Sequence, residues 1–554
     1  MNRISLALCA WLALGAAVAA RAQAPPAKYW RHRFGSSPVA EREVDGLTER
    51  ISDGKLHLQV REFLTLVLKN LAGVQITRLD VYASVNKIVS AKSPFDPTLS
   101  LGFNAIRSVS PLSYGIAGSP SGGQFQLPET FNSLSQNSVI DYRQLLPTGQ
   151  SFEATFNAYR SSGDGYPYPS IFGALNLQLT QPLLQNRGNL QNLTPLRVAR
   201  TQLLITSKQS EATIADTVAQ SAVQYWQAIL ARDSIRVNQQ AVDLARKSYD
   251  HDKQALELGA LSKLDIYQSE TQVAERSRDL TQAQYQYEVL LDGLRRLIGA
   301  DLNPEIRATQ IVLDDDPSIL PDKSAILPLE QAISKAFEER PELAAANASV
   351  SIDEMNARAS RDALLPQLNL SLQGGASGPG YNLLTAGTAV GTVPATPPPG
   401  LGPTLQQVLG FNYPTYGFGL SAVFPFRNPA AKASLADALV SRAQDRYRQR
   451  QIKEQIILDV RQAVHSLELA DATIQAAIRA RNLARENVDA EQQKYQLGSI
   501  TAFELLDSQS RLASTESALV TAYVDYQEAY VNYQRATWTL FDGFGMIVDK
   551  PNVR

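Results

Sequence analysis

Two acidic residues, Glu504 and Asp507, are spaced so that they would lie on one face of a helix. They follow closely on Gly498, a residue that predicts a tight turn. Carboxylates in the first turns of a helix can cap its backbone N–H groups and interact favourably with its dipole. The same carboxylates would form a cation-attracting ring if symmetry brings several copies of the chain together. The spacing leaves both interpretations open.

No other residues show the spacing of a catalytic or metal-binding site. The four histidines are isolated from one another: His32, His57, His251 and His465. Three methionines and a single cysteine, Cys9, leave no soft-metal site. The sequence has no phosphate-binding glycine loop, no H-E-x-x-H and no G-x-S-x-G. We therefore predict no catalytic residue, no cofactor and no metal, and a protein that is not an enzyme.

The segment around Gly498 occurs twice in the chain. Leu497-Gly498 matches Leu258-Gly259, and Glu504 matches Asp265. The two segments align without a gap, and each lies between long apolar-periodic runs. This internal duplication predicts two helix–turn–helix units that turn at residues 259 and 498. After the second turn, Ser499 or Thr501 is expected to cap the next helix.

The N-terminus has the pattern of a secretory signal peptide. Arg3 precedes an apolar run from Ile4 to Ala20, which is short for a membrane span and is followed by Ala20-Arg21-Ala22. We predict a signal peptide over residues 1–22, with a second cleavage pattern ending at Ala24. The 52 basic and 54 acidic residues are balanced and form no basic stripe, which argues against nucleic-acid binding. An exported chain of this kind is periplasmic, secreted or a membrane β-barrel.

Alternating apolar and polar residues predict four strands, two in each repeat. Leu99, Leu101 and Phe103, for example, alternate with small and polar residues. We expect the strands near residues 97–107, 171–181, 366–373 and 414–424. The first repeat is longer between its strands, and a further hairpin near residues 142–160 would fit there, in a position that the sequence does not fix.

The remaining long segments are predicted to be helical, among them Leu56 to Ala91 and its repeat from about Ala325 to Arg361. Val460, Val464 and Leu467 belong to a coiled-coil seam in the second repeat. The predicted organisation has six parts: the signal peptide at 1–22, an N-terminal extended tail at 23–55, a first repeat at 56–300, a linker at 301–324, a second repeat at 325–542, and a C-terminal tail at 543–554. Four strands cannot close a barrel, and open strand edges are not tolerated in lipid. Strands that span a membrane must therefore come from several chains: two chains would give eight strands and three would give twelve.

The chain resembles the TolC-like outer-membrane efflux proteins, also called outer-membrane factors. Three segments carry the resemblance: Arg340-Pro341-Glu342-Leu343, Thr180-Gln181-Pro182-Leu183, and Tyr495 to Gly498 with Leu505-Leu506-Asp507. The resemblance implies an α+β membrane protein: a homotrimer with a twelve-stranded β-barrel (four strands per chain) in the outer membrane, continued by an antiparallel coiled-coil tunnel through the periplasm. The implied partners are outer-membrane lipid, a periplasmic adaptor protein and an inner-membrane transporter.

The resemblance also implies roles for residues at the two turns. The periplasmic gate would consist of Glu504, Asp507, Asp265 and Tyr495, with Tyr495 in the link between neighbouring helices. The tips that dock the adaptor would be Gly259, Gly498, Leu258 and Leu497. This chain departs from the family pattern at the first ring acid, which is glutamate, and at Ile500, where the family has a basic residue.

The function implied is that of a passive exit duct of a tripartite efflux pump. Two alternatives stay open at this point: a type I protein secretion channel, and a periplasmic coiled-coil scaffold that conducts nothing. The sequence identifies neither the transported substrate nor the particular adaptor and transporter.

Overall fold

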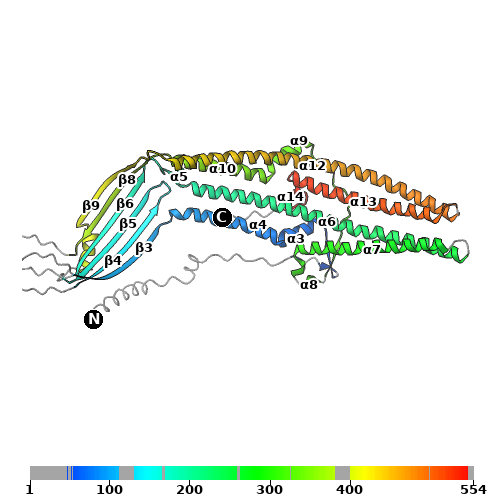
Figure 1. The fold of residues 1–554 in the computed structure, drawn as a ribbon, viewed down its shortest axis with the longest axis horizontal. Helices are drawn as coiled ribbons and strands as arrows, with labels where there is room; N and C mark the ends of the chain where they lie inside the picture. Colours follow the sequence, from blue (N-terminus) through cyan, green and yellow to red (C-terminus); the bar gives the residue numbers. More distant parts are fainter. Residues whose placement is uncertain are drawn as a thin grey trace, which may run out of the picture.

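The computed structural model describes most of the chain, and its elements form an elongated molecule with strands at one end and helices along the rest (Figure 1). The described residues are 46–47, 51–52, 54–111, 130–164, 169–258, 263–302, 304–307, 309–322, 324, 326–380, 400–497 and 499–546. The predicted signal peptide, Gly259 and Gly498 lie outside them.

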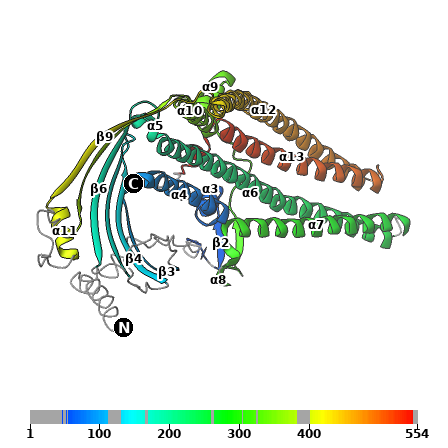
Figure 2. The ribbon, with the colours of Figure 1, turned by 60° about the vertical axis from the view of Figure 1, so that its left-hand side comes forward.

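Six antiparallel strands form the main sheet, in the order β3-β4-β5-β6-β8-β9. Their bounds are β3 (Thr98–Pro111), β4 (Thr130–Leu145), β5 (Ser151–Gly163), β6 (Ser170–Pro182), β8 (Gln367–Gly378) and β9 (Tyr413–Val423). β3 and β9 are the two edges of the sheet, and every residue of β3 is exposed. Figure 2 shows the curvature of this sheet beside the helices.

The prediction of four strands per chain is wrong, because β4 and β5 stand between β3 and β6. The other four strands lie where the alternation placed them. β5 does alternate, with Phe152, Ala154 and Phe156 separated by polar residues. β4 lacks a clear period of two because Val139 and Ile140 are adjacent, and they point to opposite faces of the sheet. The hairpin was therefore only half visible in the sequence.

Four long helices form two antiparallel hairpins. α6 (Thr194–Glu257) and α7 (Lys263–Ile298) make the first hairpin, and α12 (Pro429–Gln496) and α13 (Ala502–Ala536) make the second. α6 has 64 residues and α12 has 68, so each helix is about 100 Å long. Of the predicted seam on α12, Val460, Val464 and Leu467 are buried.

Shorter helices pack against the first halves of the long ones. α3 (Val60–Asn70) and α4 (Ala72–Lys92) contact α6, while α9 (Leu329–Glu339) and α10 (Pro341–Asp362) contact α12. The prediction of helix from Leu56 is wrong at its start, because Leu56 lies in β2 (Lys55–Leu58). The remaining helices are α5 (Asn189–Asn192), α8 (Pro304–Arg307), α11 (Leu401–Leu409) and α14 (Leu540–Gly543).

A small second sheet connects the two repeats. β2 pairs with β1 (Ile51–Ser52) and, in parallel, with β7 (Gln310–Leu313), which lies in the segment expected to be a linker. Leu56 and Leu58 of β2, with Ile311 and Leu313 of β7, are buried in a core shared with α3, α6 and α7. Among the described residues, none of the helices combines the length and the apolar character needed to cross a bilayer.

Candidate functional site: the tips of the helical hairpins

The last residues of α6 and α12 and the first residues of α7 and α13 lie at the end of the molecule opposite the main sheet (Figure 1). The C-cap residues of α6 and α12 are Leu258 and Leu497, directly before the two predicted turn glycines. The exposed fractions of Leu258 and Leu497 are 84% and 83%. Each tip therefore presents a large apolar side chain to solvent, and docking of a partner at these two leucines stays a prediction.

Glu504 caps the helix that follows the second turn. The N-cap of α13 is Thr501, whose Oγ1 accepts a hydrogen bond from the backbone N–H of Glu504 at 3.4 Å. In return, Oε2 of Glu504 accepts from the backbone N–H of Thr501 at 3.0 Å. This reciprocal pair is a capping box and stabilises the start of the helix. The carboxylate is exposed as well, so capping and participation in a ring of acids are compatible.

Asp507 forms an ion pair with a residue that the sequence reading missed. Its Oδ2 lies 2.7 Å from a guanidinium nitrogen of Arg511, one turn further along α13. The side chains are 48% and 74% exposed, so the pair is worth less than about 1 kcal/mol. A spacing of four between an acid and a base is visible in the sequence and could have identified Arg511. Asp265 lies at the start of α7, and its side chain is outside the described residues.

A buried carboxylate joins the two hairpins close to their tips. The hydroxyl of Tyr495 on α12 donates to Oδ1 of Asp252 on α6, and the hydroxyl of Ser269 on α7 donates to Oδ2. Asp252 is 1% exposed. The ring of His251 lies 5.3 Å from that of Tyr495. We call Asp252, Ser269 and Tyr495 the Asp252 cluster. Two hydroxyl donors stabilise a carboxylate that would otherwise be costly to bury.

Two further hydrogen bonds connect the hairpins beside this cluster. Nε2 of Gln509 on α13 donates to Oγ of Ser248 on α6 at 3.2 Å. A guanidinium nitrogen of Arg276 on α7 donates to Oγ of Ser510 on α13 at 2.8 Å. The second hairpin is therefore held to both helices of the first. The structure thus places the predicted gate residue Tyr495 in a contact between hairpins and supplies its partner, Asp252, which the sequence reading did not identify.

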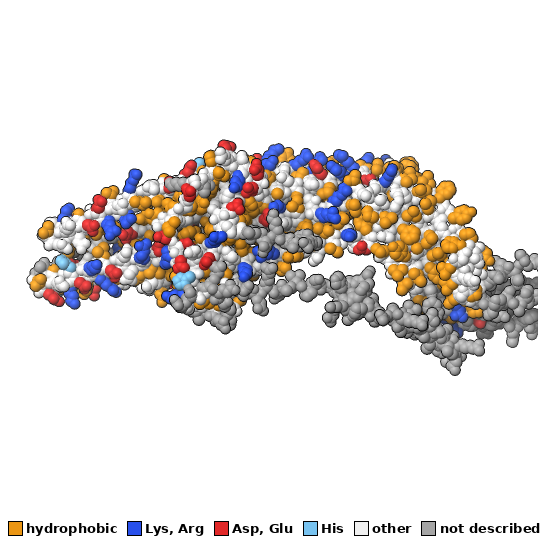
Figure 3. Space-filling view, turned by 180° about the vertical axis from the view of Figure 1, so that it is seen from behind, with side chains coloured by type: hydrophobic (Ala, Val, Ile, Leu, Met, Phe, Trp, Pro, Cys, Tyr) orange, Lys and Arg blue, Asp and Glu red, His pale blue; other side chains and the backbone are white. Residues whose placement is uncertain are grey.

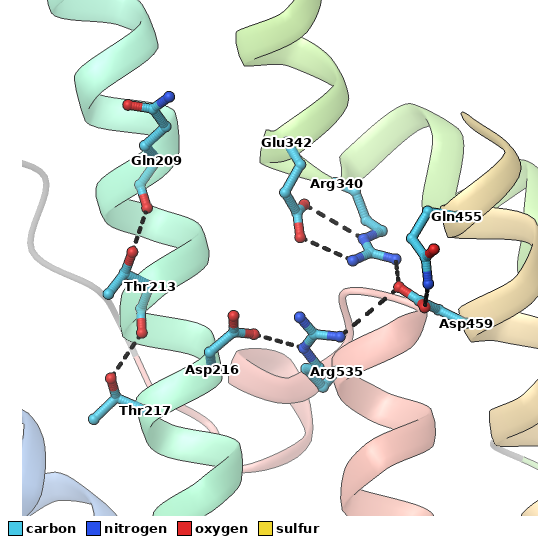
Figure 4. Close-up of polar contacts among 9 residues, drawn as sticks. All are labelled: Gln209, Thr213, Asp216, Thr217, Arg340, Glu342, Gln455, Asp459 and Arg535. Carbon is cyan, nitrogen blue, oxygen red and sulfur yellow. Dashed lines mark hydrogen bonds and ion pairs between the residues drawn. The ribbon is translucent and has the colours of Figure 1, made fainter. Parts of the chain in front are cut away.

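A second polar network joins the repeats at mid-length (Figure 4). Arg340, which is 5% exposed, donates to both carboxylate oxygens of Glu342 at 3.3 and 2.8 Å, and to Asp459 of α12 at 2.9 Å. Arg535 of α13 donates to Asp216 of α6 at 2.6 Å and lies 3.9 Å from Asp459. We call these five residues the Arg340 network. Burial alone would lower the pKa of Arg340, but the carboxylates of Glu342 and Asp459 raise it above its usual value.

Glu528 on α13 is a carboxyl group whose charge depends on pH in the neutral range. Burial, followed by the charge of Asp525, raises the pKa of Glu528 to about 7, and a hydrogen bond with Gln227 opposes the rise. The pKa of Glu528 is thus higher in the folded protein than the value of 4.5 expected in the unfolded chain. The resulting contribution to folding stability is fully present below pH 4.5 and is lost as the pH rises through about 7.

Replacing Glu528 with glutamine is therefore expected to change stability in a pH-dependent way. Near pH 4 the variant should unfold like the parent, and near pH 8 it should be more stable by on the order of 1 kcal/mol after allowance for solvent screening. Thermal unfolding followed by circular dichroism at the two pH values measures the difference. Glu486→Gln, at an exposed position on α12, serves as the control. An equal effect of Glu528→Gln at both pH values would contradict the assignment.

The comparisons with known proteins identify the family. A family model described as outer membrane efflux protein matches residues 150–300 and 332–537. Among curated proteins there is no match. Solved structures with a similar fold include the CmeC outer membrane channel of Campylobacter jejuni, at a TM-score of 0.60 and 12% identity, covering 91% of this chain and 94% of that one.

Two further structures resemble the chain to a similar degree. The outer membrane protein VceC of Vibrio cholerae has a TM-score of 0.57 and 13% identity over 86% of this chain and 95% of that one. The MtrE outer membrane channel of Neisseria gonorrhoeae, in its open state, has a TM-score of 0.57 and 17% identity over 87% of this chain and 89% of that one. The family model covers both repeats, including the second hairpin with the Tyr495 and Glu504 segment. The chain therefore belongs to the outer membrane efflux protein family and is an outer-membrane protein.

Proposed function

We propose that the chain is the outer-membrane exit duct of a tripartite efflux pump, working as a homotrimer. The observation that carries the proposal is the direct continuation of the main sheet into two helical hairpins, whose longer helices, α6 and α12, are each about 100 Å long. Across the middle of the sheet one face is mainly apolar and the other mainly polar, as in strands that separate lipid from a water-filled lumen. Helices of this length would prolong the lumen through the periplasm.

Energy for transport comes from a partner in this proposal, and the duct itself is passive. The partners are a periplasmic adaptor protein and an inner-membrane transporter. The adaptor docks at the hairpin tips, where the exposed Leu258 and Leu497 flank the turns at Gly259 and Gly498. Purified protein should run as a heat-modifiable trimer from the outer-membrane fraction and conduct ions in planar bilayers. A water-soluble protein without conductance would instead indicate a coiled-coil scaffold.

A type I protein secretion channel is the alternative within the same architecture. Deletion of the gene from the host bacterium distinguishes the two functions. Increased sensitivity to small toxic compounds indicates efflux. Loss of an exported polypeptide from the medium indicates secretion.

The periplasmic gate is proposed to be a ring of acids at the hairpin tips. Glu504 and Asp507 of three chains, with Asp265 nearby, would hold negative charge at the narrow end of the tunnel. The double variant Glu504→Gln with Asp507→Asn is expected to weaken channel block by divalent cations at least about fivefold, because even one nearby charge contributes about 1 kcal/mol in water. Single-channel recordings at increasing divalent concentration measure the block. An unchanged block would reject this assignment.

Arg511 is expected to weaken the block by divalent cations that Glu504 and Asp507 produce. Its guanidinium group pairs with Asp507 and offsets part of the charge of the ring. Arg511→Gln should therefore strengthen divalent block severalfold in the same recordings. Arg479→Gln provides the control, because Arg479 is exposed on α12 and lies further from the tip than the Debye length of about 8 Å. Weaker block in Arg511→Gln would contradict the proposed offset.

A further inference from the structure

The hairpin β4–β5 is built like the rest of the main sheet. Directly paired residues of an antiparallel sheet share a face, so the register defines rows of neighbours across all six strands. One row, from β3 to β9, is apolar throughout: Leu101, Ile140, Phe156, Leu175, Ala376 and Pro414. The adjacent row, on the opposite face, is polar or glycine: Ser100, Asp141, Thr155, Asn176, Gly375 and Thr415. The hairpin therefore continues both faces of the sheet at these two rows.

At the end of the β4–β5 hairpin that lies nearest the helices, the charged residues are on the polar face of the sheet. Arg143 is 2.7 Å from Asp141 and 3.1 Å from Glu153, and the hydroxyl of Thr155 donates to Asp141 at 2.8 Å. Charges of this kind are costly toward lipid and ordinary toward a water-filled lumen. Figure 3 shows hydrophobic side chains gathered over the strand end of the molecule, in contrast with the mixed charges over the helices. Two arginines on the apolar side, Arg107 and Arg160, lie beyond the apolar row, toward the strand ends away from the helices.

The turn of the hairpin is anchored where the sheet meets the helices. Gly149 adopts φ of +90°, and a Cβ at this position would approach the backbone oxygen of Asn186 to 2.4 Å. The backbone N–H of Gly188 donates to the carbonyl of Thr148 at 3.0 Å. The turn spans only residues 146–150, on the helix side of the sheet, where barrel proteins have short turns. The hairpin is thus fixed into the sheet at both its strands and its turn.

The edge strand β3 of one copy of the chain is suited to pair with the edge strand β9 of a second copy. β3 has 14 residues and β9 has 11, and neither has a neighbour on its outer side among the described residues. All adjacent strands are antiparallel and their number is even, so β3 of one copy would meet β9 of the next in an antiparallel pair. Barrels of this class have an even number of antiparallel strands and no open edge.

We propose that three copies of the chain close a barrel of eighteen strands, with β4 and β5 as part of its wall. This inference rests on the homotrimer of the proposed function. Barrel diameter grows roughly linearly with strand number, so this barrel is about 1.5-fold wider than the twelve-stranded one expected from the resemblance. At eighteen strands the interior is a water-filled channel. The strand wall of the outer-membrane part is then wider than that of a twelve-stranded duct.

Paired single-cysteine variants test whether the hairpin belongs to the wall. The only cysteine, Cys9, lies in the predicted signal peptide, so the background is free of thiols. Phe156→Cys and Asn157→Cys place a thiol on opposite faces of β5. In isolated outer membranes, a water-soluble maleimide should label Asn157→Cys about tenfold faster than Phe156→Cys, and a lipid-soluble maleimide should label Phe156→Cys.

Leu175→Cys and Asn176→Cys on β6 are the matched controls, because Leu175 is the direct partner of Phe156. If the control pair shows the lumen–lipid contrast and the β5 pair is labelled equally by the water-soluble reagent, the hairpin lies outside the wall. The eighteen-stranded barrel is then overturned while the proposed duct stands. If neither pair shows the contrast, the membrane barrel itself fails.

Cryo-electron microscopy of the unmodified protein provides an independent test. A map of the detergent-solubilised trimer should show eighteen strands, six from each chain. Twelve strands in a trimeric barrel would overturn the inference without affecting the duct, whereas a particle without a barrel would overturn both.

Discussion

Removing the Asp252 cluster is expected to open the tip end of the tunnel. In the double variant Tyr495→Phe with Asp252→Ala, the buried carboxylate and the hydroxyl that binds it are both lost. Each hydrogen bond to a charged group contributes about 1.5–3 kcal/mol. Loss of one such bond shifts the ratio of closed to open states at least about tenfold, if the bond is made only in the closed state. The duct should then conduct without its adaptor.

Single-channel conductance in planar bilayers measures this opening. The single variant Tyr495→Phe should lie between the parent and the double variant, because Ser269 still binds Asp252. Tyr285→Phe is the control, since Tyr285 is an exposed tyrosine on α7. Parental conductance in the double variant would show that the cluster does not hold the tip closed. In that case its role is confined to packing of the hairpins.

Replacing Arg340 with alanine is expected to cause the largest loss of stability of any change considered. The guanidinium group is almost fully buried and forms hydrogen bonds with Glu342 and Asp459. Removing one partner of a buried ion pair leaves an uncompensated charge and costs about 3–5 kcal/mol. We expect a value near 3 kcal/mol, because Asp459 keeps its hydrogen bond from Gln455 at 2.7 Å and its proximity to Arg535.

Thermal unfolding of the detergent-solubilised protein, followed by loss of helical circular dichroism, measures this effect. The matched control is Arg448→Ala on α12, whose side chain is 70% exposed and pairs with Asp445 at 2.7 Å. Its loss should change stability by less than about 0.5 kcal/mol. Equal effects in the two variants would show that burial of the Arg340 network adds nothing to stability.

The sequence predicted those features that depend on local patterns. The period of the long helices and the repeated turn segment located both hairpins, and Thr501 was among the expected caps. Clear alternation located β3, β6, β8 and β9. β4 was missed because its apolar residues are not confined to one face: Val139 and Ile140 are consecutive. In such a strand, pairing with its neighbours fixes the structure more than its own pattern does.

Contacts between distant segments could not be predicted from one sequence. Asp252 and Tyr495 are 243 positions apart, and no local feature of the segment around Asp252 marks it as the partner of Tyr495. The Arg340 segment was noticed for its resemblance, but its ion pairs with Asp459 depend on how α10 packs against α12. The gate roles of Glu504, Asp507 and Asp265 remain predictions, and they require the assembled trimer.

The pairing of β2 with β7 has a consequence for how the protein matures. The core around these strands combines Leu56 near the start of the described chain, Ile311 from its middle and Leu540 close to its end. A polypeptide that crosses the inner membrane N-terminus first cannot complete this core until nearly all of it has been exported. Contacts so distant in sequence form slowly, and the apolar surface stays exposed to aggregation in the meantime. We therefore expect the early segments to need protection from aggregation until the last ones arrive.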